Sequence, residues 1–277
     1  MIKVKNLNFS YQNTKDKAIK NLNFEIDKGE VFGFLGPSGA GKTTAQRLII
    51  GLLRGYTGDI EILGRERKDW NKSFYEKIGV AFDFPNLYVK LSAYENLNLI
   101  GSYYENPPKN IDELLDHVGL LKDKDKKVEG FSKGMKMRLN FIRSIMHDPD
   151  IVFFDEPTSG LDPVNAKIIK DKILDMKREG KTIFLTTHNM TVAEQLCDRV
   201  AFINEGSLSA IDSPKNLMVE HGKPTVDIEY LDKGKIVTQK IMLKNMNTNN
   251  NFKKILENHE IITIHSQEAT LEDVFIL

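Results

Sequence analysis

The pattern of apolar and polar positions divides the chain into several kinds of segment. Residues 2–11 and 21–30 alternate between apolar and polar side chains, which is typical of half-buried antiparallel strands. Short continuous apolar runs, typical of strands buried on both faces of a sheet, lie at 31–36, 151–154, 182–187 and 200–203. Helical spacing separates these runs, at residues 42–53, 135–146, 164–178 and 190–197. Strands that alternate with helices predict an α/β fold, a mostly parallel sheet wrapped by helices.

Two regions depart from this alternation. Residues from about 85 to 148 show helical spacing without a buried strand, which indicates an inserted helical subdomain. After Ser213 and Pro214 the runs alternate again, around a polar loop and a short helical stretch. We therefore predict a main domain over residues 1–218 and a small C-terminal α+β domain over residues 222–277.

Composition and charge narrow the classes of function. The chain has 277 residues, of which 40% are hydrophobic, so a large core is possible. Its 39 basic and 39 acidic side chains cancel, so no overall field favours nucleic acid, and we expect no nucleic-acid partner. The single cysteine fits a reducing cytosol. No apolar run approaches the roughly 20 residues of a membrane span, and the first residues lack the apolar stretch of a signal peptide. If the protein associates with a membrane, we therefore expect it to do so through a partner protein.

The strongest chemical signal is "GPSGAGKTT", which fits the phosphate-loop pattern G-x-x-x-x-G-K-[ST]. It follows an apolar run and opens a helix, so backbone N–H groups and the helix N-terminus can bind phosphate. We expect Lys42 to contact the β- and γ-phosphates and the Thr43 hydroxyl to bind Mg²⁺. The alternative is a glycine-rich turn before an ordinary helix. The predicted ATP-binding residues here are Gly36, Pro37, Ser38, Gly39, Ala40, Gly41, Lys42, Thr43 and Thr44.

Two further groups stand at the carboxyl ends of predicted parallel strands, where ligands bind in such sheets. Asp155 is placed to hold Mg²⁺, and Glu156 to orient and deprotonate the attacking water. If the phosphate loop were absent, we would interpret Asp155 and Glu156 only as acidic residues that end a strand before Pro157. His188 follows another strand and could bond a γ-phosphate, although a lone histidine there is more often a surface or capping residue. Tyr11 could stack on adenine, or could serve packing alone.

Taken in order, these motifs resemble those of the ATP-binding cassette (ABC) ATPases, the nucleotide-binding subunits of ABC transporters. The resemblance covers roughly residues 1–215. Its motifs are the aromatic Tyr11, the phosphate loop at 36–44, the signature region at 131–135, the acidic pair at 151–156, "SGLD" at 159–162 and His188. It implies a P-loop NTPase cassette with an antiparallel β edge, and it adds Ser132, Gly134 and Asp162 to the nucleotide-binding residues and gives His188 a catalytic role.

The resemblance also implies how the chain works. Two such subunits, this chain and a second copy or a related chain, would form a head-to-tail dimer around two Mg-ATP. Each ATP would lie between the phosphate loop of one subunit and the signature of the other, so ATP would shift the population toward the closed dimer. Membrane-spanning permease subunits would convert closure into transport, which places this chain in the cytoplasm, peripheral on the inner face of the cell membrane.

The match departs from the family pattern at two places. The usual signature Leu-Ser-Gly-Gly-Gln reads "FSKGM" here, which keeps Ser132 and Gly134 and introduces Lys133, facing either phosphate or solvent. This variant and the ending "TLEDVF" resemble subunits that export drugs, ions and peptides. The family's glutamine that touches Mg²⁺ and links to the membrane partner is replaced by Asp83. We predict that Asp83 keeps the metal-binding and coupling role.

Two other functions stay open on the sequence alone. One is a soluble ABC ATPase that acts outside transport, on nucleic acid, ribosomes or iron–sulfur assembly, although the chain lacks both a long coiled coil and a second cassette. The other is an ATP-dependent clamp or regulator that hydrolyses poorly. Glu156 and His188 argue against it, whereas Asp83 and the altered signature at 131–135 allow it. The sequence does not name a cargo.

Overall fold

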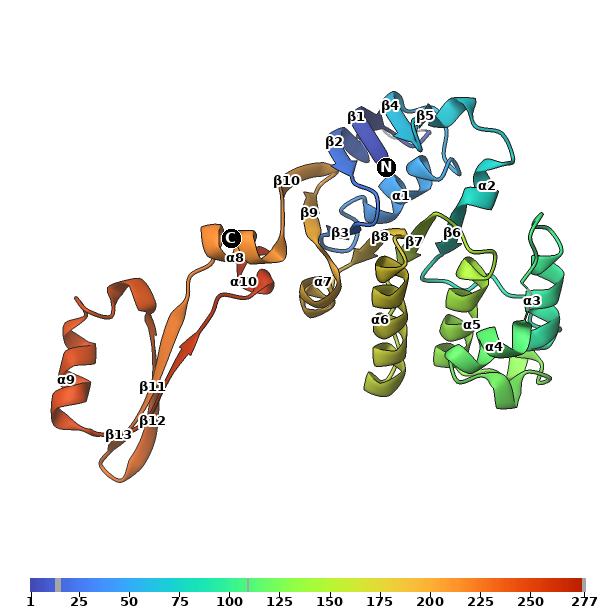
Figure 1. The fold of residues 1–277 in the computed structure, drawn as a ribbon. Coiled ribbons are helices and arrows are strands. Elements are labelled where there is room, and N and C mark those ends of the chain that lie inside the picture. Colours follow the sequence, from blue (N-terminus) through green and yellow to red (C-terminus); the bar gives the residue numbers. More distant parts are fainter. Residues whose placement is uncertain (13–15, 109, 276–277) are drawn as a thin grey trace. The chain divides into compact units, whose positions relative to one another are not determined.

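The computed structural model describes residues 1–12, 16–108 and 110–275. It divides the chain into two compact units, one from Met1 to Ile211 and the other from Asp212 onward (Figure 1). Helix α8 (Pro214–His221) belongs to the second unit, whereas the domain limit predicted from the sequence, at residue 218, falls inside this helix. In the described residues no helix has the length and hydropathy needed to cross a membrane.

A six-stranded sheet in the order β10-β9-β3-β8-β7-β6 is the centre of the first unit. Its strands are β3 (Val31–Leu35), β6 (Ile78–Ala81), β7 (Ile151–Asp155), β8 (Thr182–Thr187), β9 (Arg199–Asn204) and β10 (Ser207–Asp212). The pairs β3–β8, β3–β9, β7–β8 and β6–β7 are parallel. All residues of β3, β7 and β8 are buried, which is why these strands are continuously apolar in the sequence. The predicted fold class is confirmed.

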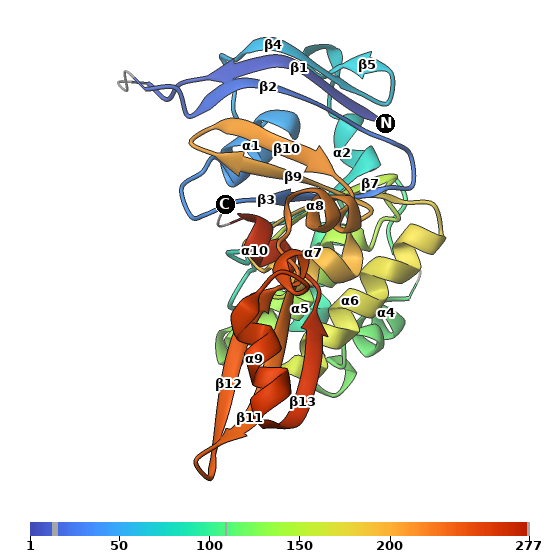
Figure 2. The same ribbon diagram turned by 90° about the vertical axis from the view of Figure 1, so that its left-hand side faces the viewer.

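A second, antiparallel sheet has the order β2-β1-β4-β5. Its strands are β1 (Ile2–Phe9), β2 (Ile19–Ile26), β4 (Thr57–Ile62) and β5 (Arg65–Glu66). Figure 2 shows it as a layer of its own, with α1 (Lys42–Ile49) between it and the larger sheet. One apolar cluster contains buried residues of both sheets and of α1. Phe24 of β2 stacks on Phe32 of β3 at 5.6 Å between ring centroids and contacts Phe184 of β8. These aromatic contacts join the two sheets, and α1 packs into the same cluster through Ala45, Leu48 and Ile49.

All but the first of the remaining α-helices of the first unit begin at a residue whose side chain caps the helix. These remaining helices are α2 (Phe74–Lys77), α3 (Ala93–Gly101), α4 (Ile111–His117), α5 (Lys133–Ile145), α6 (Pro163–Arg178) and α7 (Met190–Leu196). Ser92 and Glu95 form a reciprocal capping box at the start of α3. Ser132 caps α5 and Asp162 caps α6, where Pro163 occupies the first turn. Two of the predicted nucleotide-binding residues therefore also cap helices with their side chains.

The second unit contains a three-stranded antiparallel sheet with helices beside it. The strands, in the order β12-β11-β13, are β11 (Thr225–Asp232), β12 (Lys235–Met242) and β13 (Glu260–Gln267), and the helices besides α8 are α9 (Asn250–Asn258) and α10 (Leu271–Phe275). Its core is small, formed by Val226, Ile228, Ile241, Phe252 and Ile255. Phe252 and Ile255 lie three residues apart on α9, so one face of this helix covers the sheet.

The only cysteine of the chain, Cys197, is enclosed by the first unit. A Cβ atom at Gly33 would come within 2.7 Å of the Cys197 Sγ atom, so β3 requires glycine at this position. Burial raises the pKa of the Cys197 thiol far above its ordinary value. The thiol therefore stays protonated and acts as a small apolar core group.

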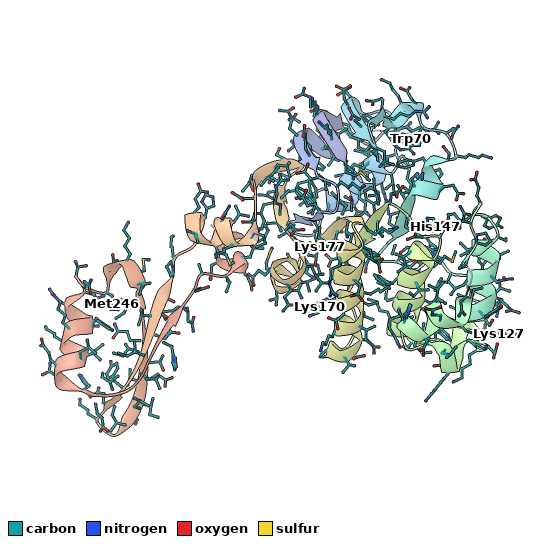
Figure 3. All side chains as sticks on the ribbon, in the orientation of Figure 1. Trp70, Lys127, His147, Lys170, Lys177 and Met246 are labelled. Carbon is teal, nitrogen blue, oxygen red and sulfur yellow. The ribbon has the colours of Figure 1, made fainter. Side chains whose placement is uncertain are left out.

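Another buried titratable group, His147, lies after α5 in the first unit (Figure 3). Its ring stacks on Tyr104 at 3.8 Å between centroids, and its Nε2–H donates to the Ile78 carbonyl at 3.0 Å. Its Nδ1 is buried without a hydrogen-bond partner among the described residues. Burial lowers the pKa of His147 below 6.5, while the Ile78 carbonyl and Asp148 oppose this effect. The neutral ring is therefore the form that the fold accommodates.

This lowered pKa predicts that acid destabilises the first unit. Below pH 6.5 the unfolded chain binds a proton at His147 that the folded chain does not bind, so stability is complete above pH 6.5 and falls as the pH drops toward the lowered pKa. One such group contributes at most about 1.4 kcal/mol per pH unit. Urea unfolding followed by the fluorescence of Trp70, the single tryptophan, should show this loss, with a weaker pH dependence in His147→Phe. The half-exposed His117 provides the control: His117→Phe should keep the wild-type slope, and an unchanged slope in His147→Phe would contradict the assignment.

Candidate functional site

The predicted phosphate-binding residues form one loop between β3 and α1. This loop runs from Gly36 to Gly41, and Lys42 to Thr44 form the first turn of the helix. A Cβ atom at Gly36 would lie 2.3 Å from the Ile203 carbonyl oxygen, so only glycine allows the loop to pass β9 there. Gly41, the N-cap of α1, has φ 110°, a conformation that favours glycine. No side chain among the described residues caps the α1 N-terminus, so its N–H groups are available to an anion.

Lys42 is held beneath this loop. Its ammonium group donates to the carbonyl oxygens of Gly36 at 2.6 Å and Pro37 at 3.1 Å. Burial lowers the pKa of Lys42, and the nearby carboxylates of Glu156 and Asp155 oppose this effect. A cation that is already directed into the loop needs only to exchange carbonyl partners for phosphate oxygens.

Asp155, at the end of β7, lies beside Thr43 of α1. The Thr43 hydroxyl donates to Asp155 Oδ2 at 3.2 Å, and the Thr186 hydroxyl donates to Asp155 Oδ1. No group of three or more His, Cys, Asp or Glu side chains in the described residues could hold a metal ion. A hydroxyl and a single carboxylate nevertheless fit Mg²⁺, which uses one or two carboxylates together with phosphates and waters. The residues present therefore suit a metal that arrives with a nucleotide.

Glu156 and His188 are brought together at the ends of β7 and β8. The His188 Nδ1 atom lies 2.5 Å from Glu156 Oε1, which also accepts from the His188 backbone N–H at 2.9 Å. The Thr187 hydroxyl donates to Glu156 Oε2 at 3.0 Å. Glu156 has φ 51°, in the left-handed region that is costly for a residue other than glycine. These contacts hold a carboxylate in one orientation at the ligand edge of the sheet, as a general base requires.

Tyr11 reaches the same helix from the end of β1. Its hydroxyl lies 3.0 Å from the Thr44 hydroxyl, and its ring packs edge-on against Phe9. The ring remains partly exposed. The structure thus brings this tyrosine next to the last residue of the phosphate loop motif, where a planar base could stack on it.

The signature residues lie apart from the phosphate loop. The Ser132 hydroxyl accepts from the Met135 backbone N–H at 3.2 Å and is exposed at the start of α5. Among the described residues, no hydrogen bond joins Ser132 or Gly134 to residues 36–44. The exposed Lys133 lies over Gly160: a Cβ atom on Gly160 would meet its Cε at 3.1 Å and its Nζ at 3.3 Å. In this conformation Lys133 packs on the 159–162 segment.

Asp162 is the last residue of that segment, and its carboxylate caps the helix that follows it, α6. Its carboxylate accepts from the backbone N–H groups of Val164 and Asn165, both at 3.0 Å, and from the Asn165 side chain. These hydrogen bonds, led by the Asn165 side chain, lower the pKa of Asp162. The structure gives this residue a capping role; its predicted contact with nucleotide remains a prediction.

Asp83 follows β6 and lies near Thr43 and Asp155, the residues predicted to bind Mg²⁺. It lines an open cavity of about 610 Å³ together with Thr43 and Asp155. The backbone beside it is held by α5: Asn140 donates to the Phe82 carbonyl at 2.9 Å, and Arg143 donates to the Asn86 carbonyl at 2.8 Å. Helix α5, which Ser132 caps, therefore also holds the segment that contains Asp83.

Sequence reasoning missed the residues that orient the predicted ones. Thr186 and Thr187 contact Asp155 and Glu156, and Asn140 anchors the Asp83 segment. The two threonines end the apolar run at 182–187, and a hydroxyl pair at the carboxyl end of a buried strand is the signal that could have identified them. Nothing in the local sequence marks Asn140.

Comparison with protein families matches both units. The family described as "ABC transporter" matches residues 19–159. The family described as "Fluoroquinolone efflux ABC transporter C-terminal domain" matches residues 224–268. The cassette and the C-terminal unit are thus each recognised independently.

Individual proteins give the same result. A fluoroquinolones export ATP-binding protein of Mycobacterium tuberculosis is 46% identical over 277 residues, which is 100% of this chain and 92% of that protein. The bacitracin transport ATP-binding protein BcrA of Bacillus licheniformis is 36% identical over 80% of this chain and 72% of its own length. A solved dimeric ATP-binding cassette, MJ0796 bound to ADP and Pi, has a TM-score of 0.71 at 26% identity, over 77% of this chain and 98% of that one. The resemblance seen in the motifs is confirmed: this chain belongs to the ATP-binding subunits of ABC transporters and is an ATPase of that family.

Proposed function

We propose that this chain drives the export of a fluoroquinolone-like drug through separate membrane subunits. One observation carries the proposal: the similarity to the mycobacterial fluoroquinolones export protein continues through the second unit. The cassette alone is similar to relatives named for different cargoes, such as bacitracin, so it supports transport without naming a cargo. In this proposal the chain lies on the inner face of the cell membrane, held there by its permease partners.

The proposed reaction is hydrolysis of ATP. The phosphate loop binds the nucleotide phosphates, Lys42 neutralises charge on the β- and γ-phosphates, and Tyr11 stacks on the adenine. Mg²⁺, held by Thr43 and Asp155, would neutralise phosphate charge. Glu156, oriented by His188 and Thr187, accepts a proton from the attacking water.

The site is proposed to be completed by a second subunit. Ser132 is exposed and Gly134 half-buried at the start of α5, and among the described residues no hydrogen bond joins them to the phosphate loop. The hydroxyl and the helix N-terminus there are suited to a γ-phosphate held by another copy or a related subunit. ATP would then stabilise the closed dimer because only that state provides both halves of the site.

The two other functions left open by the sequence are less well supported. The described relatives are named for export and transport, which favours a transporter over an ATPase acting elsewhere. A clamp that hydrolyses poorly would not need a general base, whereas Glu156 has three hydrogen-bond donors that orient it.

An export assay tests the proposal. Tagged protein would be purified from membranes of its own cells to identify its membrane subunits, and the complex would then be produced in a fluoroquinolone-sensitive bacterium. We expect lower drug accumulation, measured by the drug's own fluorescence in cell lysates, than in cells carrying the same complex with Glu156→Gln. Unchanged accumulation with active ATP hydrolysis would contradict the cargo. Failure to recover any membrane subunit would contradict the transport role.

A further inference from the structure

A second cavity lies on the side of the first unit formed by the antiparallel sheet. It has a volume of about 720 Å³ and is lined by the chain after α1 and by the segment from β5 to α2. None of the phosphate-loop residues lines it. Its size is that of a small-molecule pocket, which typically measures roughly 300–1,000 Å³.

The lining of this cavity has an excess of positive charge. The lining contains four basic side chains and a single carboxylate, that of Glu66. The basic residues are Arg54, Arg67, Lys68 and Lys72. In the described part of the chain, none of the four forms an ion pair. The Glu66 carboxylate has a backbone partner, since its Oε1 accepts from the Ile60 N–H at 3.4 Å. The cavity therefore attracts anions.

Arg67 is the fixed element of this cavity. Its side chain is only 8% exposed, and its guanidinium lies 4.0 Å from the centre of the Phe74 ring. Nη2 donates to the Ile50 carbonyl at 2.8 Å, while Nε is buried without a partner among the described residues. A Cβ atom on Gly51 would lie 2.0 Å from Nη2, so the guanidinium is confined between Gly51 and Phe74. A buried cation without a carboxylate partner is costly, and an anion in the cavity would offset that cost.

Aromatic side chains complete the lining. Trp70, labelled in Figure 3, and Tyr75 border the cavity. The Trp70 indole N–H donates to the Ile62 carbonyl at 3.1 Å, which fixes its ring. Arginine recognises phosphate through several N–H donors, and aromatic rings provide apolar surface for the group that carries the phosphate.

We propose that this cavity is a binding site for a phosphate ester, separate from the ATP site. The phosphate lies near Arg67 and the two lysines, and the esterified group lies against Trp70 and Tyr75. A soluble phosphate ester and a phospholipid headgroup at the membrane surface share this chemistry.

Trp70 provides the test, because it is the single tryptophan of the chain and lines the cavity. Phenyl phosphate is titrated into the full chain in saturating ADP and Mg²⁺, which fill the nucleotide site. We expect a saturable change in tryptophan fluorescence. In Lys68→Glu/Lys72→Glu, whose two residues are exposed, we expect binding about tenfold weaker or more, because two attractions become repulsions. The matched control Lys28→Glu/Lys127→Glu has the same net charge on exposed residues outside the cavity and should bind like the wild type.

A second arm identifies the source of the phosphate. The same three proteins are sedimented with vesicles of phosphatidylcholine alone and of phosphatidylcholine with phosphatidylglycerol. Binding to the anionic vesicles that is lost only in the Lys68/Lys72 variant identifies a lipid headgroup, and phenyl phosphate binding alone identifies a soluble ester. The proposal is overturned if neither probe binds, or if the cavity variant and the control bind equally. Neither result depends on ATP hydrolysis or export, so the proposed function is tested separately.

Discussion

A Glu156→Gln variant should bind Mg-ATP with nearly wild-type affinity and hydrolyse it about 100- to 10,000-fold more slowly, the range of general-base catalysis. The amide keeps the size of the side chain and can still accept from the Thr187 hydroxyl or the His188 N–H, so the loop geometry is maintained. It cannot accept the proton of water. Because hydrolysis is the step that reopens the proposed dimer, this variant should also accumulate as a dimer in ATP.

Phosphate release and size-exclusion chromatography measure the two effects. Glu257→Gln, a change of the same kind at an exposed position of α9, should leave both unchanged. Full-rate hydrolysis by Glu156→Gln would remove Glu156 from the role of general base. Slow hydrolysis without an ATP-dependent dimer would leave that role intact and contradict the proposed closure.

Replacing Asp83 by alanine should reduce ATP hydrolysis and drug export by the assembled transporter about 10- to 100-fold, as is typical when a residue supporting a metal site is lost. The reason is its position: Asp83 shares one cavity with Thr43 and Asp155, and its segment is anchored to α5 by Asn140. Asp83→Gln restores the residue that the family usually carries and should retain most of the activity, since its carbonyl oxygen can also serve Mg²⁺ or its waters.

These Asp83 variants are measured in the complex with the membrane subunits, because coupling is part of the predicted role. Asp125→Ala removes an exposed carboxylate elsewhere in the helical region and should be silent. Unchanged export by Asp83→Ala would contradict the coupling role. A similar loss in Asp83→Ala and Asp83→Gln would show that the negative charge itself is required.

The sequence predicted best what depends on local pattern. Strands β3, β7 and β8 are buried on both faces, so their apolar runs identify them. Strand β6 has only four residues, one of them Gly79, and β10 is half-buried along most of its length. Neither shows a clear period, and neither was predicted.

The residues of the candidate site likewise fall into those that a local motif predicts and those that only the fold brings together. The phosphate loop is contiguous, so its residues can be assigned from one motif. The contacts that orient Glu156 and Asp155 come from β8, about thirty positions later in the chain, and become visible only when the parallel strands are paired. The cavity around Arg67 depends on the positions of Gly51 and the Phe74 ring, which both lie against the guanidinium. No repeating pattern of apolar and polar residues indicates this arrangement.

The burial of Cys197 has a practical consequence for following this subunit at work. A protonated thiol enclosed in the core does not react with maleimides or spin-label reagents under native conditions. The native chain is therefore chemically equivalent to a cysteine-free background. A reporter attached to an introduced surface cysteine would label one site only, and the approach of two subunits could be recorded by energy transfer or electron resonance without altering the residue that packs against Gly33.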